Sequence, residues 1–117
     1  MNIIHRDIRI ENLLINKDGI VKIKGFKNAA YLTKDNTLRP TPIGKTENKA
    51  PEMIRPEEGY DKKVDVWAFG ILAYKLATGK DPWENTKGDR LIGKIVLSHC
   101  EGKKIKKLDV MAPELYN

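Results

Sequence analysis

The chain has 117 residues and a net charge of +6, with 40% hydrophobic and 32% charged residues. This balance is typical of a globular protein of one domain and argues against a disordered tail. Cys100 is the single cysteine, which excludes an internal disulfide and favours a reducing compartment. No signal peptide and no membrane span are predicted, so we expect a cytoplasmic or nuclear protein without a membrane partner.

The positive charge is scattered along the chain, apart from a lysine-rich run at residues 103–107. Proteins that bind single-stranded nucleic acid interleave such charges with aromatic residues that stack on bases. This run contains no aromatic residue, so we interpret it as a solvated face and expect no nucleic-acid partner.

The first half of the chain predicts a β-hairpin followed by a long loop. Short apolar or alternating runs flank residues 16–19 and predict the hairpin over residues 13–24, with Gly19 in its turn. Residues 27–49 lack periodicity and predict a surface loop, which at that length is usually functional.

The second half of the chain predicts helices, so the expected fold class is mainly α with a small β-hairpin. A short helix is predicted from Pro51 to Arg55 and a weaker one over residues 88–100. The main helix is predicted from Val64 to Thr78, and it ends at Gly79. It is apolar almost all round, so we expect it to be buried on most sides and to be the most buried element.

Residues 5–12 read HRDIRIEN and match the pattern H-R-D-x-x-x-x-N of a phosphotransferase catalytic loop. In that chemistry the Asp accepts a proton from the substrate hydroxyl, and the Asn holds a metal ion on the phosphates. A loop of this length brings both side chains to one site. Alone, this short motif arises often by chance.

Further motifs follow in the same order as in one known family. Residues 50–52 read APE and residues 65–70 read DVWAFG, which fits D-x-W-x-x-G. With the hairpin and the loop, these motifs resemble the eukaryotic protein kinases, and the later segments are most similar to the PAK-type Ser/Thr kinases. Arg9 departs from that group, where Lys is usual. The resemblance implies that residues 1–117 are a partial kinase domain, the C-terminal lobe without its last helices and without the N-terminal lobe.

The resemblance implies roles in catalysis and cofactor binding for several residues. Asp7 would be the catalytic base, with Arg9 beside it in the catalytic loop. Asn12 would bind the metal ion of the cofactor. Leu14 would lie under the adenine of ATP, supported by two core leucines of the main helix, Leu72 and Leu76.

Other matching residues would have regulatory or structural roles. Arg6 would meet a phosphorylated residue of the activation loop, for which Thr41 is the candidate, although Thr41 is also readable as an ordinary loop residue. Asp65 would accept hydrogen bonds from the catalytic-loop backbone, or would be only a helix N-cap. The remaining structural candidates are His5 and Phe26, stacked in the spine that links the lobes, and Glu52, whose usual Arg partner is not in the chain.

Three departures from the family pattern bear on activity. The metal-binding Asp of the D-F-G motif is Gly25, which has no side chain to offer as a ligand. Lys27 replaces the Gly of the same motif and adds a positive charge there. The Thr that steadies the catalytic Asp is Lys45, which we hypothesise to pair with Asp7 and block it.

Three interpretations follow. The first is an inactive kinase fragment that acts by binding a protein partner over exposed apolar surface. The second is the C-terminal-lobe portion of a working Ser/Thr kinase. The third is a small basic binding module unrelated to kinases. For this chain alone we expect no cofactor; Mg²⁺ and ATP are expected if it is part of an intact kinase.

Overall fold

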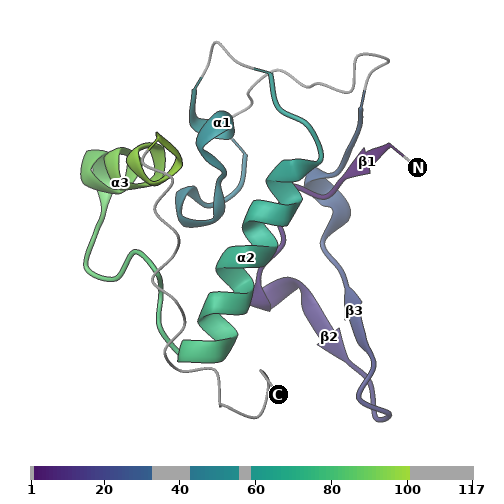
Figure 1. Cartoon of the computed structure of the whole chain (residues 1–117). Coiled ribbons are helices and arrows are strands. Elements are labelled where there is room, and N and C mark those ends of the chain that lie inside the picture. Colours follow the sequence, from purple (N-terminus) through teal and green to yellow (C-terminus); the bar gives the residue numbers. More distant parts are fainter. Residues whose placement is uncertain (1, 33–42, 56–58, 101–117) are drawn as a thin grey trace, which may run out of the picture.

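The computed structural model describes residues 2–32, 43–55 and 59–100, with side chains described as far as Ser98. Figure 1 shows three α-helices in this part of the chain, α1 (Pro51–Ile54), α2 (Lys63–Thr78) and α3 (Gly88–Cys100). Helical residues outnumber strand residues there, which confirms the mainly α class.

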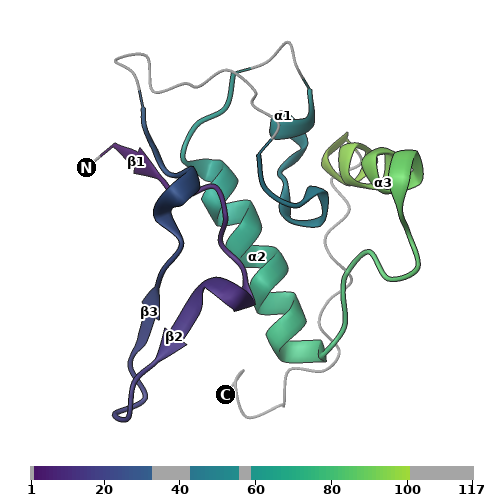
Figure 2. The same ribbon diagram turned by 180° about the vertical axis from the view of Figure 1, so that it is seen from behind.

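Two small antiparallel sheets lie on one side of α2. Strand β1 (Ile3–Ile4) pairs with β4 (Ala30–Tyr31), and β2 (Leu13–Ile15) pairs with β3 (Val21–Ile23). The β2–β3 pair is the predicted hairpin, and Figure 2 shows it extending away from the helices.

The turn of the hairpin follows from its side chains. Asn16 Oδ1 accepts hydrogen bonds from the backbone amides of Asp18 and Ile20, at 3.0 and 2.8 Å. Gly19 takes a φ of +78°, which glycine adopts without steric cost. The turn chemistry therefore sets where the two strands begin and end.

The predicted loop over residues 27–49 contains short elements. Besides β4, it includes the end of the 3-10 helix η2 (Phe26–Asn28) and all of the 3-10 helix η3 (Thr46–Asn48), so short elements interrupt the predicted surface loop near both of its ends. A third 3-10 helix, η1 (Ile10–Asn12), leads into β2. Residues 33–42 lie outside the described part of the chain.

The main core lies where β1, α1 and the start of α2 meet. It consists of six buried residues with Ala30 and Trp67 packed against them: Ile4, Leu32, Ala50, Met53, Tyr60 and Val64. Helix α3 covers α1 and η3 and buries Leu91 and Ile95, whereas Ile92 is exposed.

The prediction that α2 is buried on most sides is wrong. Its buried residues are Val64, Ala68, Ile71 and Leu72, which follow one face. Val66, Phe69 and Leu76 on the opposite face have exposed fractions of 69, 61 and 63%. The described elements pack against only one side of the helix, so an all-round apolar composition does not become all-round burial. No described helix is long and apolar enough to cross a membrane.

Candidate functional site

Asp65 anchors the loop of residues 5–12 to α2. Its carboxylate accepts hydrogen bonds from the backbone amides of His5 and Arg6, at 2.7 and 2.9 Å. These bonds hold Arg6 at a φ of +64°, a left-handed conformation that is uncommon outside glycine. The N-cap of α2 is Lys62, so Asp65 acts as the predicted acceptor for the loop and not as the alternative N-cap.

His5 is buried and links the loop to the end of the hairpin. Its Nε2 lies 2.9 Å from the carbonyl oxygen of Lys24, and its Nδ1 lies 3.2 Å from the Asp7 backbone nitrogen. A carbonyl only accepts and an amide only donates, so both bonds are made by the neutral ring with its proton on Nε2. The His5 ring meets the Phe26 ring edge to face at 4.7 Å, which brings together the pair that the sequence predicted.

Asp7 lies at the centre of the site with an exposed fraction of 7%. The Asn12 amide nitrogen donates to the Asp7 carbonyl at 2.7 Å and to its carboxylate at 3.0 Å. The Arg9 Nε lies 3.1 Å from the other carboxylate oxygen, so the two side chains form an ion pair without a hydrogen bond. Asp7 and Asn12 therefore meet as the sequence predicted, and Arg9 lies beside the Asp7 carboxylate.

Glu11 extends this charge cluster toward the surface. Its carboxylate lies 3.6 Å from Arg9 and 3.6 Å from Lys45. The pKa of Glu11 is lowered from its ordinary value, first by a hydrogen bond from its own backbone amide and then by the charges of Arg9 and Lys45, against a desolvation that raises it. The sequence did not indicate this role for Glu11, because one of its two cations, Lys45, lies far away along the chain.

The described residues do not form the expected ion pair between Lys45 and Asp7. Lys45 pairs with Glu11, and the cation on Asp7 is Arg9. The segment that carries Lys45 is held in place by Trp83, whose Nε1 donates to the Glu47 carbonyl at 3.0 Å. Its position depends on this tertiary contact, which the local sequence around Lys45 does not reveal.

Gly25 lies directly against Asn12. It has a φ of +85°, and a Cβ atom placed there would lie 2.5 Å from Asn12 Oδ1. Because the Asn12 nitrogen faces Asp7, its oxygen faces Gly25. The space that a metal-binding side chain at position 25 would need is therefore filled by the Asn12 amide.

The residues present do not fit the Mg²⁺ ion that the resemblance implies. Mg²⁺ requires near-octahedral oxygen ligands, usually with one or two carboxylates. At this site position 25 offers no side-chain ligand, so of the two protein ligands that the resemblance implies only the Asn12 amide oxygen is present. Among the described residues, no group of three His, Cys, Asp or Glu side chains lies close enough to hold a metal ion.

The expected adenine platform is only partly assembled. Leu72 is buried, but Leu14 and Leu76 have exposed fractions of 50 and 63%.

The guanidinium of Arg6 donates to the Asn28 carbonyl at 2.6 Å and to the Tyr60 hydroxyl at 3.1 Å. Its predicted partner Thr41 lies outside the described residues.

Glu52 is half-buried in α1, and no ion pair of its carboxylate occurs within the described ranges.

A cavity of about 340 Å³ lies between η1 and α2. It is lined by apolar side chains and by charges that are already paired, since Lys75 lies 2.7 Å from Asp81 and Glu11 is held by two cations. The full lining is Ile8, Arg9, Ile10, Glu11, Asn48, Leu72 and Lys75.

Comparison with known proteins identifies relatives over most of the chain. The family model described as protein kinase domain matches residues 1–116. Serine/threonine-protein kinase pakB of Dictyostelium discoideum is 45% identical over 80 residues, covering 68% of this chain and 9% of that protein. Aurora kinase of Candida glabrata is 40% identical over 112 residues, covering 96% of this chain and 28% of that protein. Serine/threonine-protein kinase cst-1 of Caenorhabditis elegans is 44% identical over 89 residues, covering 76% and 18%.

The chain thus spans only 9 to 28% of the length of these three relatives. The matches to pakB and to pakD of the same organism support the predicted likeness to PAK-type kinases.

Proposed function

Because the chain belongs to the protein kinase domain family, we propose that it is a C-terminal-lobe portion of a Ser/Thr-type kinase domain that does not transfer phosphate and acts by binding another protein. The observation that supports this proposal is the contact between Gly25 and Asn12. It makes position 25 a packed site with no ligand to offer, beside a catalytic loop that otherwise keeps its geometry.

Phosphoryl transfer depends strongly on the metal ligand that the family carries at position 25. The protein contributes little covalent chemistry to the reaction, and catalysis consists mainly of positioning and of neutralising charge with metal ions. Removal of a metal-held charge clamp costs on the order of several kcal/mol in the transition state. On this proposal Asp7 supplies the base, but the site lacks the metal ions that activate the phosphate.

A second candidate function is supported by the intact loop. Asp7 is buried and held by Asn12, with Arg9 beside it, which is the arrangement that a catalytic base needs. On that account the chain is the C-terminal-lobe portion of a working Ser/Thr kinase. Gly25 argues against it, because residues elsewhere in a longer protein do not change the side chain at position 25.

Manganese broadening of NMR signals tests the proposal. Mn²⁺ substitutes for Mg²⁺ and broadens the signals of nuclei that lie near it. We expect titration of the protein with Mn²⁺ to leave the Asn12 side-chain amide signals no more broadened than those of Asn85, an asparagine in the exposed turn before α3. Selective and saturable broadening at Asn12 would overturn the proposal and favour the second candidate.

A further inference from the structure

We propose that residues 44–49 form a strap that closes over the Asp7 carboxylate and is fastened to the catalytic loop by the ion pair between Lys45 and Glu11. We call this segment the strap. The inference goes beyond the proposed function, because it concerns access to the base at residue 7 and not the metal ligand that is absent at position 25.

The strap is a short turn that starts against the catalytic loop. The backbone amide of Asn48 donates to the Lys45 carbonyl at 3.1 Å and so closes the turn of η3. Gly44 begins the strap with a φ of +79°, and a Cβ atom placed there would lie 3.2 Å from the Arg6 carbonyl oxygen. The strap is therefore held in shape by its own backbone and lies directly on the backbone of the catalytic loop.

Little space remains between the strap and Asp7. The gap that they line together has a volume of about 10 Å³, which is barely enough for one water molecule. The Asp7 side chain has an exposed fraction of 6%, with Asn12 on one carboxylate oxygen and Arg9 on the other. The strap is thus part of what covers this carboxylate, and its release should open a path to it.

Four charges of alternating sign connect the strap to Asp7. Lys45 Nζ lies 3.6 Å from Glu11, Glu11 lies 3.6 Å from Arg9, and Arg9 lies 3.1 Å from Asp7. The Glu11 carboxylate is therefore shared by a cation of the strap and a cation of the catalytic loop. Isolated surface ion pairs contribute little, but a network of several charges contributes more.

This fastening belongs to the present chain and should respond to salt. The resemblance to kinases implies a threonine at position 45 that steadies the catalytic Asp directly, whereas Lys45 reaches Glu11 instead. The side chains of Lys45 and Glu11 have exposed fractions of 57 and 59%, so dissolved ions screen their attraction.

A second contact supplies a reporter of the strap's position. The Trp83 Nε1 donates to the Glu47 carbonyl of the strap at 3.0 Å, and this bond breaks when the strap lifts. The indole nitrogen of Trp67 is buried and makes no hydrogen bond within the described ranges. It therefore serves as an internal reference for opening of the fold as a whole.

Hydrogen exchange of the two indole NH groups with solvent, measured by NMR on the full chain, tests the fastening. Lys45→Met and Glu11→Gln each remove the ion pair with little change in size. Each should raise the Trp83 exchange rate roughly two- to fivefold, the range for an exposed pair, and the double variant should raise it no further. Raising the salt from about 50 to 500 mM should have a similar effect on the wild type and none on Lys45→Met.

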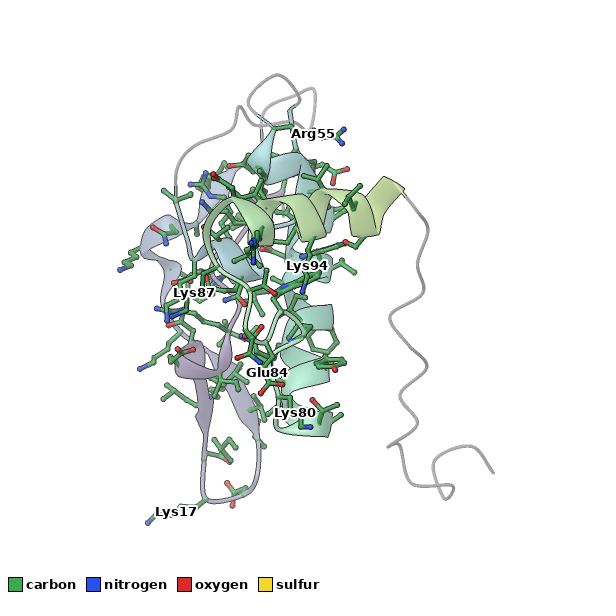
Figure 3. All side chains as sticks on the ribbon, turned by 90° about the vertical axis from the view of Figure 1, so that its left-hand side faces the viewer. Lys17, Arg55, Lys80, Glu84, Lys87 and Lys94 are labelled. Atoms are coloured by element: carbon green, nitrogen blue, oxygen red, sulfur yellow. The ribbon has the colours of Figure 1, made fainter. Side chains whose placement is uncertain are left out.

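Lys17→Met is the matched control, because it removes the same charge from an exposed lysine elsewhere. Figure 3 shows Lys17 at the tip of the hairpin, away from the helices. This variant should leave the Trp83 exchange rate unchanged.

Labelling with a carbodiimide and a small amine, read by peptide mass spectrometry, tests access to Asp7. Asp18, which is exposed in the hairpin turn, is the reference carboxylate. At less than one label per chain, we expect Asp7 to react more slowly than Asp18 in the wild type. Lys45→Met should raise the Asp7 rate roughly two- to fivefold and leave the rates of Asp18 and Asp65 unchanged.

Several outcomes would overturn the proposal. An unchanged Trp83 exchange rate in Lys45→Met and Glu11→Gln would show that the ion pair does not fasten the strap. Labelling of Asp7 as fast as that of Asp18 in the wild type would show that the strap does not close the site. Equal rises at Trp67 or Asp65 would show opening of the whole fold. None of these results depends on Mn²⁺ binding, so failure of the strap proposal and failure of the inactive-site proposal are distinguishable.

Discussion

At the scale of single residues, Asp7 is defined by the three groups that surround it. Asn12 donates a hydrogen bond to the Asp7 carboxylate, and Arg9 places a cation beside that carboxylate. The His5 ring accepts a hydrogen bond from the Asp7 backbone amide. Gly25 matters because it lets Asn12 take this position, since any larger residue would displace the Asn12 oxygen. Loss of a metal ligand and tight packing of the catalytic loop are thus two effects of one glycine.

Substitution of Gly25 should cost more stability than its backbone conformation alone explains. Gly25→Ala adds a Cβ atom against Asn12 at a positive φ, whereas Gly19→Ala has a similar φ with nothing within 4 Å. The left-handed conformation costs about 1–2 kcal/mol in both variants. We expect urea unfolding to show a further loss for Gly25→Ala, of about 1–3 kcal/mol if an Asn12 hydrogen bond breaks. Equal losses of stability in the two variants would show that the Asn12 side chain moves aside without a cost in free energy.

Gly25→Asp should not create a metal site by itself. The new carboxylate enters space that the Asn12 amide fills, so it displaces the other metal ligand as it arrives. We expect Mn²⁺ to broaden the loop signals of Gly25→Asp no more than those of Gly25→Ala. Selective broadening in the aspartate variant would show that one substitution separates this chain from a metal-binding site.

Glu11 should contribute to stability in a pH-dependent way. Its pKa is lowered in the folded chain, so its contribution is present above the ordinary glutamate value of 4.5 and is lost as the pH falls through the lower folded value. The side chain is largely exposed, so solvent screens the effect and it should be small. We expect the gap in thermal midpoint between the wild type and Glu11→Gln to shrink as the pH falls below 4.5. A gap that stays constant with pH would contradict the charge cluster.

At the scale of elements, α2 is the part against which the site is assembled. Its first turn holds the loop of residues 5–12 through Asp65, its middle contributes Ala68, Ile71 and Leu72 to the buried face, and its opposite face is exposed. The helix therefore joins the loop that carries Asp7 to the buried part of the molecule.

Removal of the Asp65 carboxylate should release the loop. Asp65→Ala leaves the backbone amides of His5 and Arg6 without their acceptor, at a cost of about 1–3 kcal/mol for each group that stays buried. Asp89→Ala is the matched control, because Asp89 also lies in the first turn of a helix but is exposed. Urea unfolding should show a much larger loss for Asp65→Ala, and similar losses would mean that only the helix dipole is involved.

Some elements could be predicted from the sequence because their signals are local. The hairpin has its turn residues at residues 16–19, and the end of α2 has Gly79 as its C-cap. The contact between Asp65 and the loop was predictable only through the resemblance to kinases. The Lys45–Glu11 pair joins residues far apart in the chain, and the exposed face of α2 depends on what packs beside it, so neither follows from local periodicity.

At the scale of the whole molecule, the described chain combines an intact catalytic-loop geometry with a site that does not fit Mg²⁺ and a scaffold helix with one open face. The first two features are the basis of the proposal that this kinase-family chain does not transfer phosphate. The charged side chains that line the cavity beside η1 are each paired with an opposite charge of the protein.

A thermal unfolding scan of the purified chain, with and without Mg²⁺ and ATP, tests the central claim most directly. A ligand that binds only the folded state stabilises it by RT ln(1 + [L]/Kd), so the midpoint rises with the logarithm of the ligand concentration once that exceeds Kd. The account predicts a cooperative transition whose midpoint is the same in buffer, in Mg²⁺ and in Mg²⁺ with ATP. A midpoint that rises with Mg²⁺ and ATP, and rises less with ATP and a chelator, would show a formed metal–nucleotide site and would contradict it.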